Sequence, residues 1–398
     1  MCSLRRVAFV LALVLATHGF ARERGPRVEV VCPAAPIPVR MNDRRILVYE
    51  LHVTNFDVVP LTLKQLDVSG DGKAPLLSLA DSKLTAAMVR VGAPMNMGSG
   101  SGNDAKAGET DAANAAKDSR TLDPGARAVI YMWIETSATV APPAALSHRL
   151  VFSATAADGG VADATLENFR VFVSQEPVLT LSPPFHGGTW LAGDGPSNTT
   201  NHRRTITAID GHIYSAERFA IDWLKVGPNG DSRHDGSARN DNWWGWGEPV
   251  LAVANGEITE VVDEFPDNTP RELPPVTLDN IGGNHVILKI AANRYVCYAH
   301  LQHGSIKVHL HDRVRTGDPL ALLGNSGNTT GAHLHLQVTD RNSMLEAQGV
   351  PFEFASFTYL GPGADYELDK HVTVPWAHSI PPGDGVVEFQ GGVINQNH

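Results

Sequence analysis

Two histidines separated by a single residue follow a stretch rich in glycine and asparagine. The stretch runs from Gly324 to Gly331 and leads into alternating residues that include His333 and His335 and end at Val338. Glycine and asparagine adopt left-handed backbone conformations at little cost, which favours a tight loop before a strand. Side chains two apart on a strand share one face and lie about 6.6 Å apart. This spacing suits one imidazole on a metal ion and the other on a water molecule, with two half-buried structural histidines as the alternative.

A second pair with the same spacing, His309 and His311, lies in a polar stretch. Charged residues flank it, namely Lys307, Asp312 and Arg313. Such a composition is typical of a turn. We therefore expect this pair to be exposed and to take no part in a site.

Two further apolar runs carry polar side chains. In the run from Tyr295 to Leu301, strict alternation would put Tyr298 and His300 on the same face. Another run carries one carboxylate, Asp222, four residues after Arg218. A carboxylate among apolar neighbours costs several kcal/mol unless it is paired or bound to metal. Asp222 is therefore expected either to pair with Arg218 or to be a metal ligand.

In their order along the chain, these elements resemble the lysostaphin/LytM-type zinc metallopeptidases, a family of peptidoglycan endopeptidases. The resemblance covers roughly residues 190–338 and rests on the order of the motifs. It implies an antiparallel β-sheet peptidase domain that binds Zn2+. Carried over residue by residue, it implies that His335 and Asp222 are zinc ligands. It also implies that His333 acts on the water and that His300 stabilises the transition state.

The sequence departs from the family at the first ligand. Arg218 stands where the family has a histidine, and a guanidinium stays protonated with no lone pair to offer. One replacement, His212, would lie about 33 Å from Asp222 along a single extended strand. The other, His202, is better placed, because a hairpin with a three-residue loop at 209–211 would set it opposite Arg218. A two-residue loop would instead turn His202 to the other face.

The expected ligand set is therefore His202, Asp222 and His335, with Zn2+ as the cofactor. Arg218 is expected to pair with Asp222 or with a substrate carboxylate, and Tyr298 to lie near the substrate. A branch of the family with the pattern Asn-x-x-x-His-Arg-Arg is similar to this chain at Asn198, His202, Arg203 and Arg204.

The expected reaction is hydrolysis of peptide bonds, in peptidoglycan cross-links or stem peptides. Three protein ligands leave a fourth position on zinc for water, and the metal lowers the pKa of that water. Two other functions remain open. One is a non-catalytic module, without zinc, that binds cell-wall peptide or regulates a partner hydrolase. The other is a structural envelope protein in which the N-terminal half does the work.

The elements that must position these residues are strands in both halves of the chain. With 398 residues, two domains are expected. Short apolar runs separated by turns predict an all-β protein with an N-terminal, Ig-like β-sandwich at 27–177. A stretch rich in small and polar residues at 95–119 predicts a mobile loop. We expect a linker at 178–190, the peptidase domain at 185–360 and a C-terminal tail at 361–398.

The first residues have the pattern of an export signal. Arg5 and Arg6 precede the apolar run 7–16, and small residues end at Ala21. The run is shorter than the about 20 residues of a membrane span. A signal peptide at 1–21 predicts a periplasmic or secreted protein with no stable membrane insertion after cleavage; an uncleaved anchor is the alternative.

The net charge indicates which partners to expect, and the cysteine content indicates whether a disulfide is expected. The formal net charge is −11 and the basic residues do not cluster, which argues against nucleic acid. Cys32 and Cys297 remain after signal cleavage. Export permits a disulfide, but we expect Cys297 to be a buried free thiol. The sequence does not indicate an oligomeric state.

Overall fold

The computed structural model describes residues 25–71, 75–92, 118–155, 160–228, 230–363 and 373–390. Within these ranges, strands dominate and the only α-helices are α1 (Asp81–Ala87) and α2 (Asn201–Arg204), so the predicted all-β class is confirmed. Neither helix of the described part is long and apolar enough to cross a membrane. The expected signal peptide, and most of the loop expected at 95–119, lie outside the described residues.

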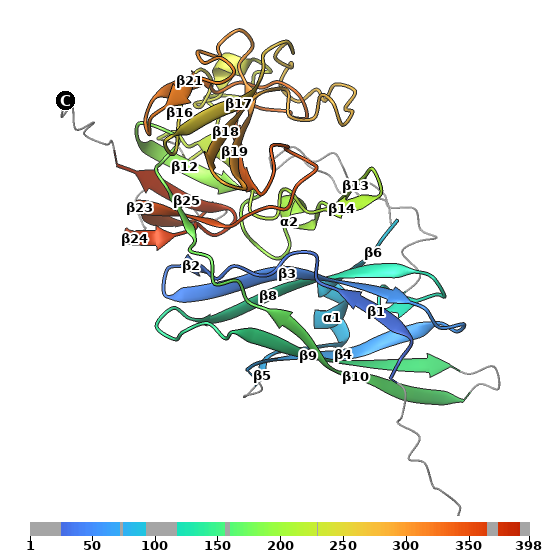
Figure 1. Ribbon diagram of the computed structural model, residues 1–398. Helices are drawn as coiled ribbons and strands as arrows, with labels where there is room; N and C mark the ends of the chain where they lie inside the picture. Colours follow the sequence, from blue (N-terminus) through green and yellow to red (C-terminus); the bar gives the residue numbers. More distant parts are fainter. Residues whose placement is uncertain are drawn as a thin grey trace, which may run out of the picture.

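The N-terminal unit is a sandwich of two antiparallel sheets (Figure 1). The first sheet has the order β1 (Val28–Val31), β3 (Arg44–Asn55), β8 (Arg127–Ser137), β6 (Met88–Arg90), with β2 (Val39–Met41) also paired to β3. The second has the order β10 (Val161–Phe172), β9 (Ala145–Thr155), β4 (Leu61–Gly70), β5 (Pro75–Ala80), with β7 (Thr121–Leu122) also paired to β4. Leu51, Leu63 and Phe152 are among the residues of the core between them.

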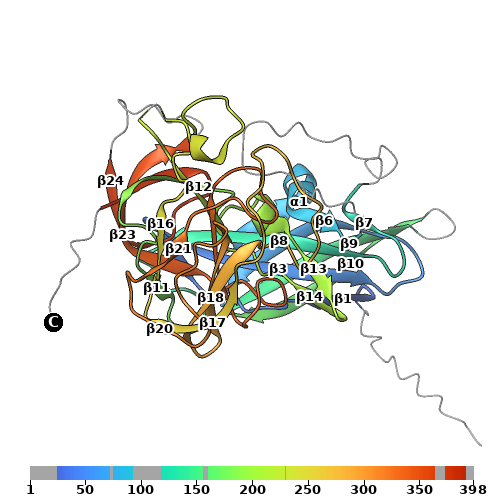
Figure 2. The ribbon, with the colours of Figure 1, turned by 90° about the horizontal axis from the view of Figure 1, so that it is seen from above.

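Strand β3 is buried on both faces, which is unusual for an outer layer of a sandwich. Leu47 and Leu51 point into the sandwich core, whereas Ile46 and Val48 belong to the core of the C-terminal unit. Glu50 lies on that same second face and is fully buried. Figures 1 and 2 both place the C-terminal unit over the sheet that contains β3 and β8. The two units therefore share a packed interface at β3.

The C-terminal unit is built on one large sheet. Its strands are β11 (Leu179–Leu181), β23 (Phe352–Pro362), β25 (Gly385–Phe389), β12 (Gly188–Gly193), β15 (Ile221–Lys225), β22 (Leu334–Thr339), β19 (Arg294–Leu301), β18 (Asn284–Ala291), β17 (Gly256–Val262) and β20 (Arg313–Val314), in this order, with β24 (Val374–Ser379) on β23. All neighbours are antiparallel except β11 and β23. Two small pairs complete the unit: β13 (Thr207–Ile209) with β14 (His212–Tyr214), and β16 (Pro249–Leu251) with β21 (Pro319–Leu322).

The unit is longer than the sequence suggested. The expected linker contains β11 and the start of β12, and both belong to the large sheet. The expected tail supplies β24 and β25, and β25 lies between β23 and β12. Val387 and Phe389 are buried in the core, but so short a strand beside prolines and glycines gave no clear periodic signal. The described C-terminal unit therefore reaches Phe389.

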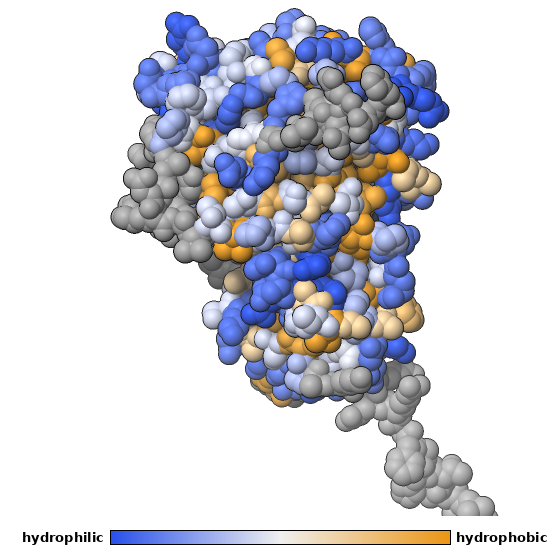
Figure 3. Space-filling model, turned by 90° about the vertical axis from the view of Figure 1, so that its left-hand side faces the viewer, coloured by the Kyte–Doolittle hydropathy of each residue, from blue (hydrophilic) through white to orange (hydrophobic). Residues whose placement is uncertain are grey.

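Cysteine placement agrees with the prediction. Cys297 is fully buried in β19 and free, and Cys32 is also a free thiol. Burial raises the pKa of the Cys297 thiol to about 12, so the side chain acts as a small apolar group. On the surface shown in Figure 3, hydrophobic residues form small groups among hydrophilic ones, as is usual for protein surfaces.

Candidate metal centre

The pairing of two central strands brings the first two candidate ligands together. Asp222 in β15 lies directly opposite His335 in β22, so their side chains share a face. Nδ1 of His335 is 3.0 Å from Oδ1 of Asp222. His333, just before β22, has its Nε2 atom 3.4 Å from the same oxygen. Both histidines of this pair thus reach one carboxylate oxygen, and all three side chains are buried.

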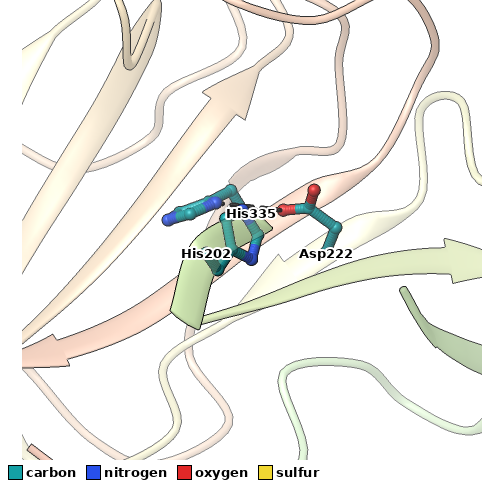
Figure 4. Close-up of side chains that lie close together, drawn as sticks. All are labelled: His202, Asp222 and His335. Carbon is teal, nitrogen blue, oxygen red and sulfur yellow. Dashed lines mark hydrogen bonds and ion pairs between the residues drawn. The ribbon is translucent and has the colours of Figure 1, made fainter. Parts of the chain in front are cut away.

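His202 completes a group of three. It lies on α2, with Nε2 3.6 Å from Oδ1 of Asp222, and its ring is 4.8 Å from that of His335. The candidate ligand atoms of His202, Asp222 and His335 all lie within 4.8 Å of one another (Figure 4). These are the three residues expected from the sequence to hold zinc, and two imidazoles with one carboxylate are a donor set that zinc accepts.

The backbone conformation that places His202 at the site differs from the predicted one. Ile209 pairs with His212, so the hairpin has a two-residue turn and the predicted three-residue loop is wrong. Asp210 and Gly211 have φ values of 50° and 79°, the left-handed conformations that such a turn requires and that Asp-Gly adopts readily. His202 lies before the hairpin, on a helical turn, so its place does not depend on the hairpin register.

The remaining histidine candidates lie away from this group. His212 is exposed on β14. The side chains of His309 and His311 are 89% and 74% exposed, as predicted for this pair. None of these three histidines is buried as the central group is.

A backbone carbonyl sets the protonation of His202. Nδ1 of His202 lies 3.0 Å from the carbonyl oxygen of Asp194. A carbonyl only accepts hydrogen bonds, so Nδ1 carries a proton, and Nε2 is the ring atom that faces Asp222 and could bind a metal ion. The carboxylate of Asp194 also accepts hydrogen bonds from the backbone N–H groups of Asn201 (2.9 Å) and His202 (3.3 Å). Sequence analysis missed this role of Asp194.

A side-chain amide sets the protonation of His335. Gln337 donates from Nε2 to the carbonyl oxygen of Met344 at 2.8 Å, which leaves its Oε1 atom facing Nε2 of His335, also at 2.8 Å. His335 therefore donates from Nε2 to Gln337, and its Nδ1 atom, which donates to the carboxylate of Asp222, is the atom left for a metal ion in place of that proton. Such outer hydrogen bonds are typical of histidines that bind metals.

His300 reaches the site through a break in the strand pattern. Ala299 lies opposite His335, so alternation alone would turn His300 to the other face. His300 instead has a left-handed φ of 61°, and its ring lies 4.8 Å from that of His333. Its Nδ1 atom is 2.8 Å from the carbonyl oxygen of Ser326, to which it donates. Backbone strain of this kind is often found at functional sites.

Tyr298, in contrast, is not at the site. It follows the normal alternation, is fully buried and belongs to the core. Its hydroxyl accepts a hydrogen bond from the backbone N–H of Val253 at 2.9 Å. The prediction that Tyr298 lies near the substrate, on the same face as His300, is therefore wrong, because the left-handed backbone at His300 separates the two side chains.

The pKa values of the ionisable groups in the site are shifted in different directions. Burial opposes ionisation of Asp222, but the charges of His202 and His333 and hydrogen bonds from the histidines hold its pKa well below the usual value. Burial lowers the pKa of His300 well below its ordinary range. For His333 and His335 burial also acts to lower the pKa, but contact with Asp222 outweighs it and the pKa is raised. Asp222 is thus anionic and His300 neutral at neutral pH.

Arg218 does not pair with Asp222, so that prediction is wrong. Its Nε and Nη2 atoms donate to the two carboxylate oxygens of Glu50, at 2.8 and 2.6 Å. It also donates to the carbonyl of Gly349 and the side chain of Gln348. Arg218 is only 4% exposed, which leaves no access for a substrate carboxylate. The signal that could have revealed its partner was Glu50, a lone carboxylate in the apolar run of β3.

Comparisons with known proteins identify the family of one domain of this chain. Residues 244–347 match the model of Peptidase family M23. Endolysin 2638A of Staphylococcus phage 2638A is 39% identical over 97 residues, which cover 24% of this chain and only 17% of the endolysin. This chain therefore spans less than a fifth of that relative.

Solved structures give weaker likenesses. The catalytic domain of lysostaphin from Staphylococcus simulans is 23% identical, with 30% of this chain and 84% of that chain covered and a TM-score of 0.20. A zinc-containing peptidase from Vibrio cholerae is 14% identical, with 78% and 81% covered and a TM-score of 0.21. The family match includes His300, His333 and His335, and this chain thus carries a domain of Peptidase family M23.

Proposed function

We propose that the protein is a zinc-dependent endopeptidase whose substrates are peptide bonds in peptidoglycan cross-links or stem peptides. The observation that carries the proposal is the convergence of His202, Asp222 and His335, in which the outer nitrogen of each histidine donates a hydrogen bond and the inner nitrogen faces the carboxylate. Members of family M23 are typically zinc-dependent peptidoglycan hydrolases, which supports the substrate class.

A bound zinc ion supplies Lewis-acid chemistry, since it lowers the pKa of water and polarises a carbonyl group. His333 donates from Nδ1 to the carbonyl oxygen of Gly331 at 2.9 Å, so its Nε2 atom is free to accept a proton. Contact with Asp222 raises the proton affinity of His333. His333 is therefore the base that takes a proton from the attacking water and returns it to the leaving amine.

His300 has a different part in this scheme. Its single N–H is used by Ser326, and burial keeps the ring neutral, so its Nε2 atom accepts a hydrogen bond rather than donating one. An acceptor beside His333 suits the orientation of the attacking water. This assignment replaces the oxyanion-stabilising role that the family resemblance implied for His300, because that role requires a donor.

The main alternative is a non-catalytic module that binds cell-wall peptide. Its basis was the loss of the first zinc ligand at Arg218. The nearness of His202 to Asp222 and His335 weakens that basis, since a third ligand is present from another segment. Export to the periplasm or outside the cell remains part of the proposal and rests on residues 1–21 alone.

Elemental analysis of the purified protein tests the proposal directly. About one zinc per chain is expected, together with release of peptide fragments from purified peptidoglycan that stops when a chelator is added. Undamaged protein that takes up no zinc would favour the binding module. Zinc-loaded protein that cleaves no peptidoglycan but cleaves other peptides would contradict only the substrate class.

A further inference from the structure

We propose that the N-terminal sandwich is part of the metal site: Glu50 of β3 holds His202 in place through Arg203. This inference rests on the proposed zinc site, because it concerns how one of the ligands is positioned. The family match begins at residue 244, so neither Glu50 nor the His202 segment belongs to the matched stretch.

The helix that carries His202 cannot hold its own shape. Helix α2 has four residues, Asn201–Arg204, and a single turn gains too few hydrogen bonds to offset the entropy of ordering it. Contacts from outside must therefore fix the position of the imidazole. Asp194 provides such contacts from the C-terminal unit, and the sandwich provides further ones.

Arg203, next to His202, is inserted into the sandwich sheet. It is fully buried and forms an ion pair with Glu50 through Nη1. Its Nη2 atom donates to the carbonyl oxygens of Tyr49 at 2.9 Å and Met132 at 3.3 Å, on the paired strands β3 and β8. Its guanidinium also lies over the ring of Tyr131, 4.9 Å from the centroid.

Arg204 ties down the end of the same helix. It donates to the carbonyl oxygen of Ala86 at 2.7 Å, and its own carbonyl accepts a hydrogen bond from the hydroxyl of Tyr131 at 2.9 Å. The amide of Asn198, before the helix, donates to the carbonyl of Tyr131 at 3.1 Å. The segment around His202 is thus fastened to the sandwich on both sides.

Glu50 joins this segment to the rest of the site. The same carboxylate pairs with Arg203, one residue after His202, and with Arg218, four residues before Asp222. Burial opposes its ionisation, but the two guanidinium groups outweigh burial and lower the pKa of Glu50 to about 2. One fixed anion therefore sets the spacing between the strand that carries Asp222 and the helix that carries His202.

Small displacements of His202 are enough to lose the ligand. Zn–N bonds are near 2.0–2.1 Å and tolerate about 0.2 Å, so a shift of α2 by about 1 Å would leave the zinc with two protein ligands. Loss of Glu50 removes the shared anion and leaves two buried cations that repel each other. The expected result is a displaced α2 rather than an unfolded sheet, because the strands carrying Asp222 and His335 remain paired.

Zinc affinity of the full-length protein, measured by competition with a chelator, tests the inference. Glu50→Gln is expected to weaken zinc binding by about 10- to 100-fold, the range seen when outer partners of metal ligands are removed. The matched control is Glu353→Gln, at the same interface: Glu353 accepts a hydrogen bond from the backbone N–H of Arg40 and does not touch α2. Unchanged affinity in Glu50→Gln, or an equal loss in the control, would overturn the inference.

A double-mutant cycle separates positioning from general damage to the fold. In protein that already carries His202→Ala, Glu50→Gln should cause little further loss of zinc affinity, because its effect passes through His202. An equal loss in both backgrounds would mean that Glu50 acts through the fold as a whole. If Glu50→Gln does not fold, Arg203→Lys serves instead, since it keeps the charge but loses the contacts made by the second guanidinium nitrogen.

A readout without metal distinguishes failure of this inference from failure of the proposed function. Hydrogen exchange of the amides at 201–204 in zinc-free protein should be at least about tenfold faster in Glu50→Gln than in wild type or Glu353→Gln. Equal exchange would refute the positioning role even if zinc binds. Wild-type protein that takes up no zinc but shows the exchange difference would refute the zinc site and leave the positioning role intact.

Discussion

The chain contains two histidine pairs of identical spacing in opposite surroundings. His309 and His311 each lie beside their own carboxylate, at 3.4 Å from Asp312 and 3.3 Å from Glu257, and both are open to solvent. His333 and His335 lie at similar distances from a carboxylate, but they share one, Asp222, and are only 4% exposed. Distance to a carboxylate therefore does not distinguish the two pairs.

Burial and convergence make the difference. An exposed ion pair contributes at most about 1 kcal/mol, because water screens it and the side chains remain free to move. In the buried pair the strands β15, β19 and β22 fix the side chains, and each has its outer hydrogen bonds satisfied. Only the buried pair presents preorganised ring nitrogens toward one carboxylate oxygen.

Removing a candidate ligand from the buried pair should have the largest effect. His335→Ala is expected to leave the purified protein without zinc and to abolish peptide cleavage, because the two protein ligands that remain would bind zinc only weakly. Asp222→Ala should do the same. Zinc content and peptidoglycan digestion measure both effects. Full zinc occupancy in His335→Ala would contradict the ligand set.

Changing the other histidine of the buried pair should separate zinc binding from peptide cleavage. His333→Ala is expected to keep zinc while cleavage falls about 10²- to 10⁴-fold, the range for loss of a general base. The measurement is the cleavage rate at full zinc occupancy. Loss of the metal in this variant would mean that the roles of His333 and His335 are exchanged.

Removing the carboxylate that two buried arginines share should lower the unfolding free energy. Glu50→Gln is expected to cost about 3–5 kcal/mol of unfolding free energy at neutral pH, because two guanidinium groups lose their buried partner. Denaturant unfolding of zinc-free protein measures this cost. As an exposed counterpart, Asp241→Asn breaks the pair with Arg239 and should have almost no effect.

The cost of Glu50→Gln should depend on pH in a defined direction. The folded-state pKa of Glu50 is about 2, below the ordinary value of 4.5, so its ionised form stabilises the native state. This contribution is complete above about pH 4.5 and is lost as the pH falls toward 2. The stability difference between wild type and variant should therefore shrink over this interval; a constant difference would show that the carboxylate charge is not responsible.

The exposed pair should give the smallest effects. His309→Ala and His311→Ala are expected to leave zinc content and cleavage unchanged and to alter stability by no more than about 0.5 kcal/mol. His212→Ala should likewise leave zinc binding intact, since this side chain is exposed on β14. A tenfold loss of zinc affinity in any of these variants would break the contrast between exposed and buried histidines.

Local sequence determined those features that depend on neighbours along the chain. Alternation in β22 was enough to predict that His333 and His335 share a face, and the short apolar runs were enough to predict an all-β protein. The polar turn around His309 and His311 likewise indicated an exposed pair. These features follow from backbone geometry and composition within a few residues, so they can be predicted without knowledge of the fold.

The partners of the charged groups and the position of the third ligand depend on contacts between distant parts of the chain. Arg218 and Glu50 are 168 residues apart, and nothing local distinguishes Glu50 from Asp222 as the partner of Arg218. His300, whose left-handed backbone separates it from Tyr298, donates its backbone N–H to the carbonyl oxygen of Gly282, which is not a neighbour along the chain. His202 reaches the site because Arg203 is anchored in another unit. A buried charge is satisfied by whichever opposite charge the packing brings near it, and that choice is made in three dimensions.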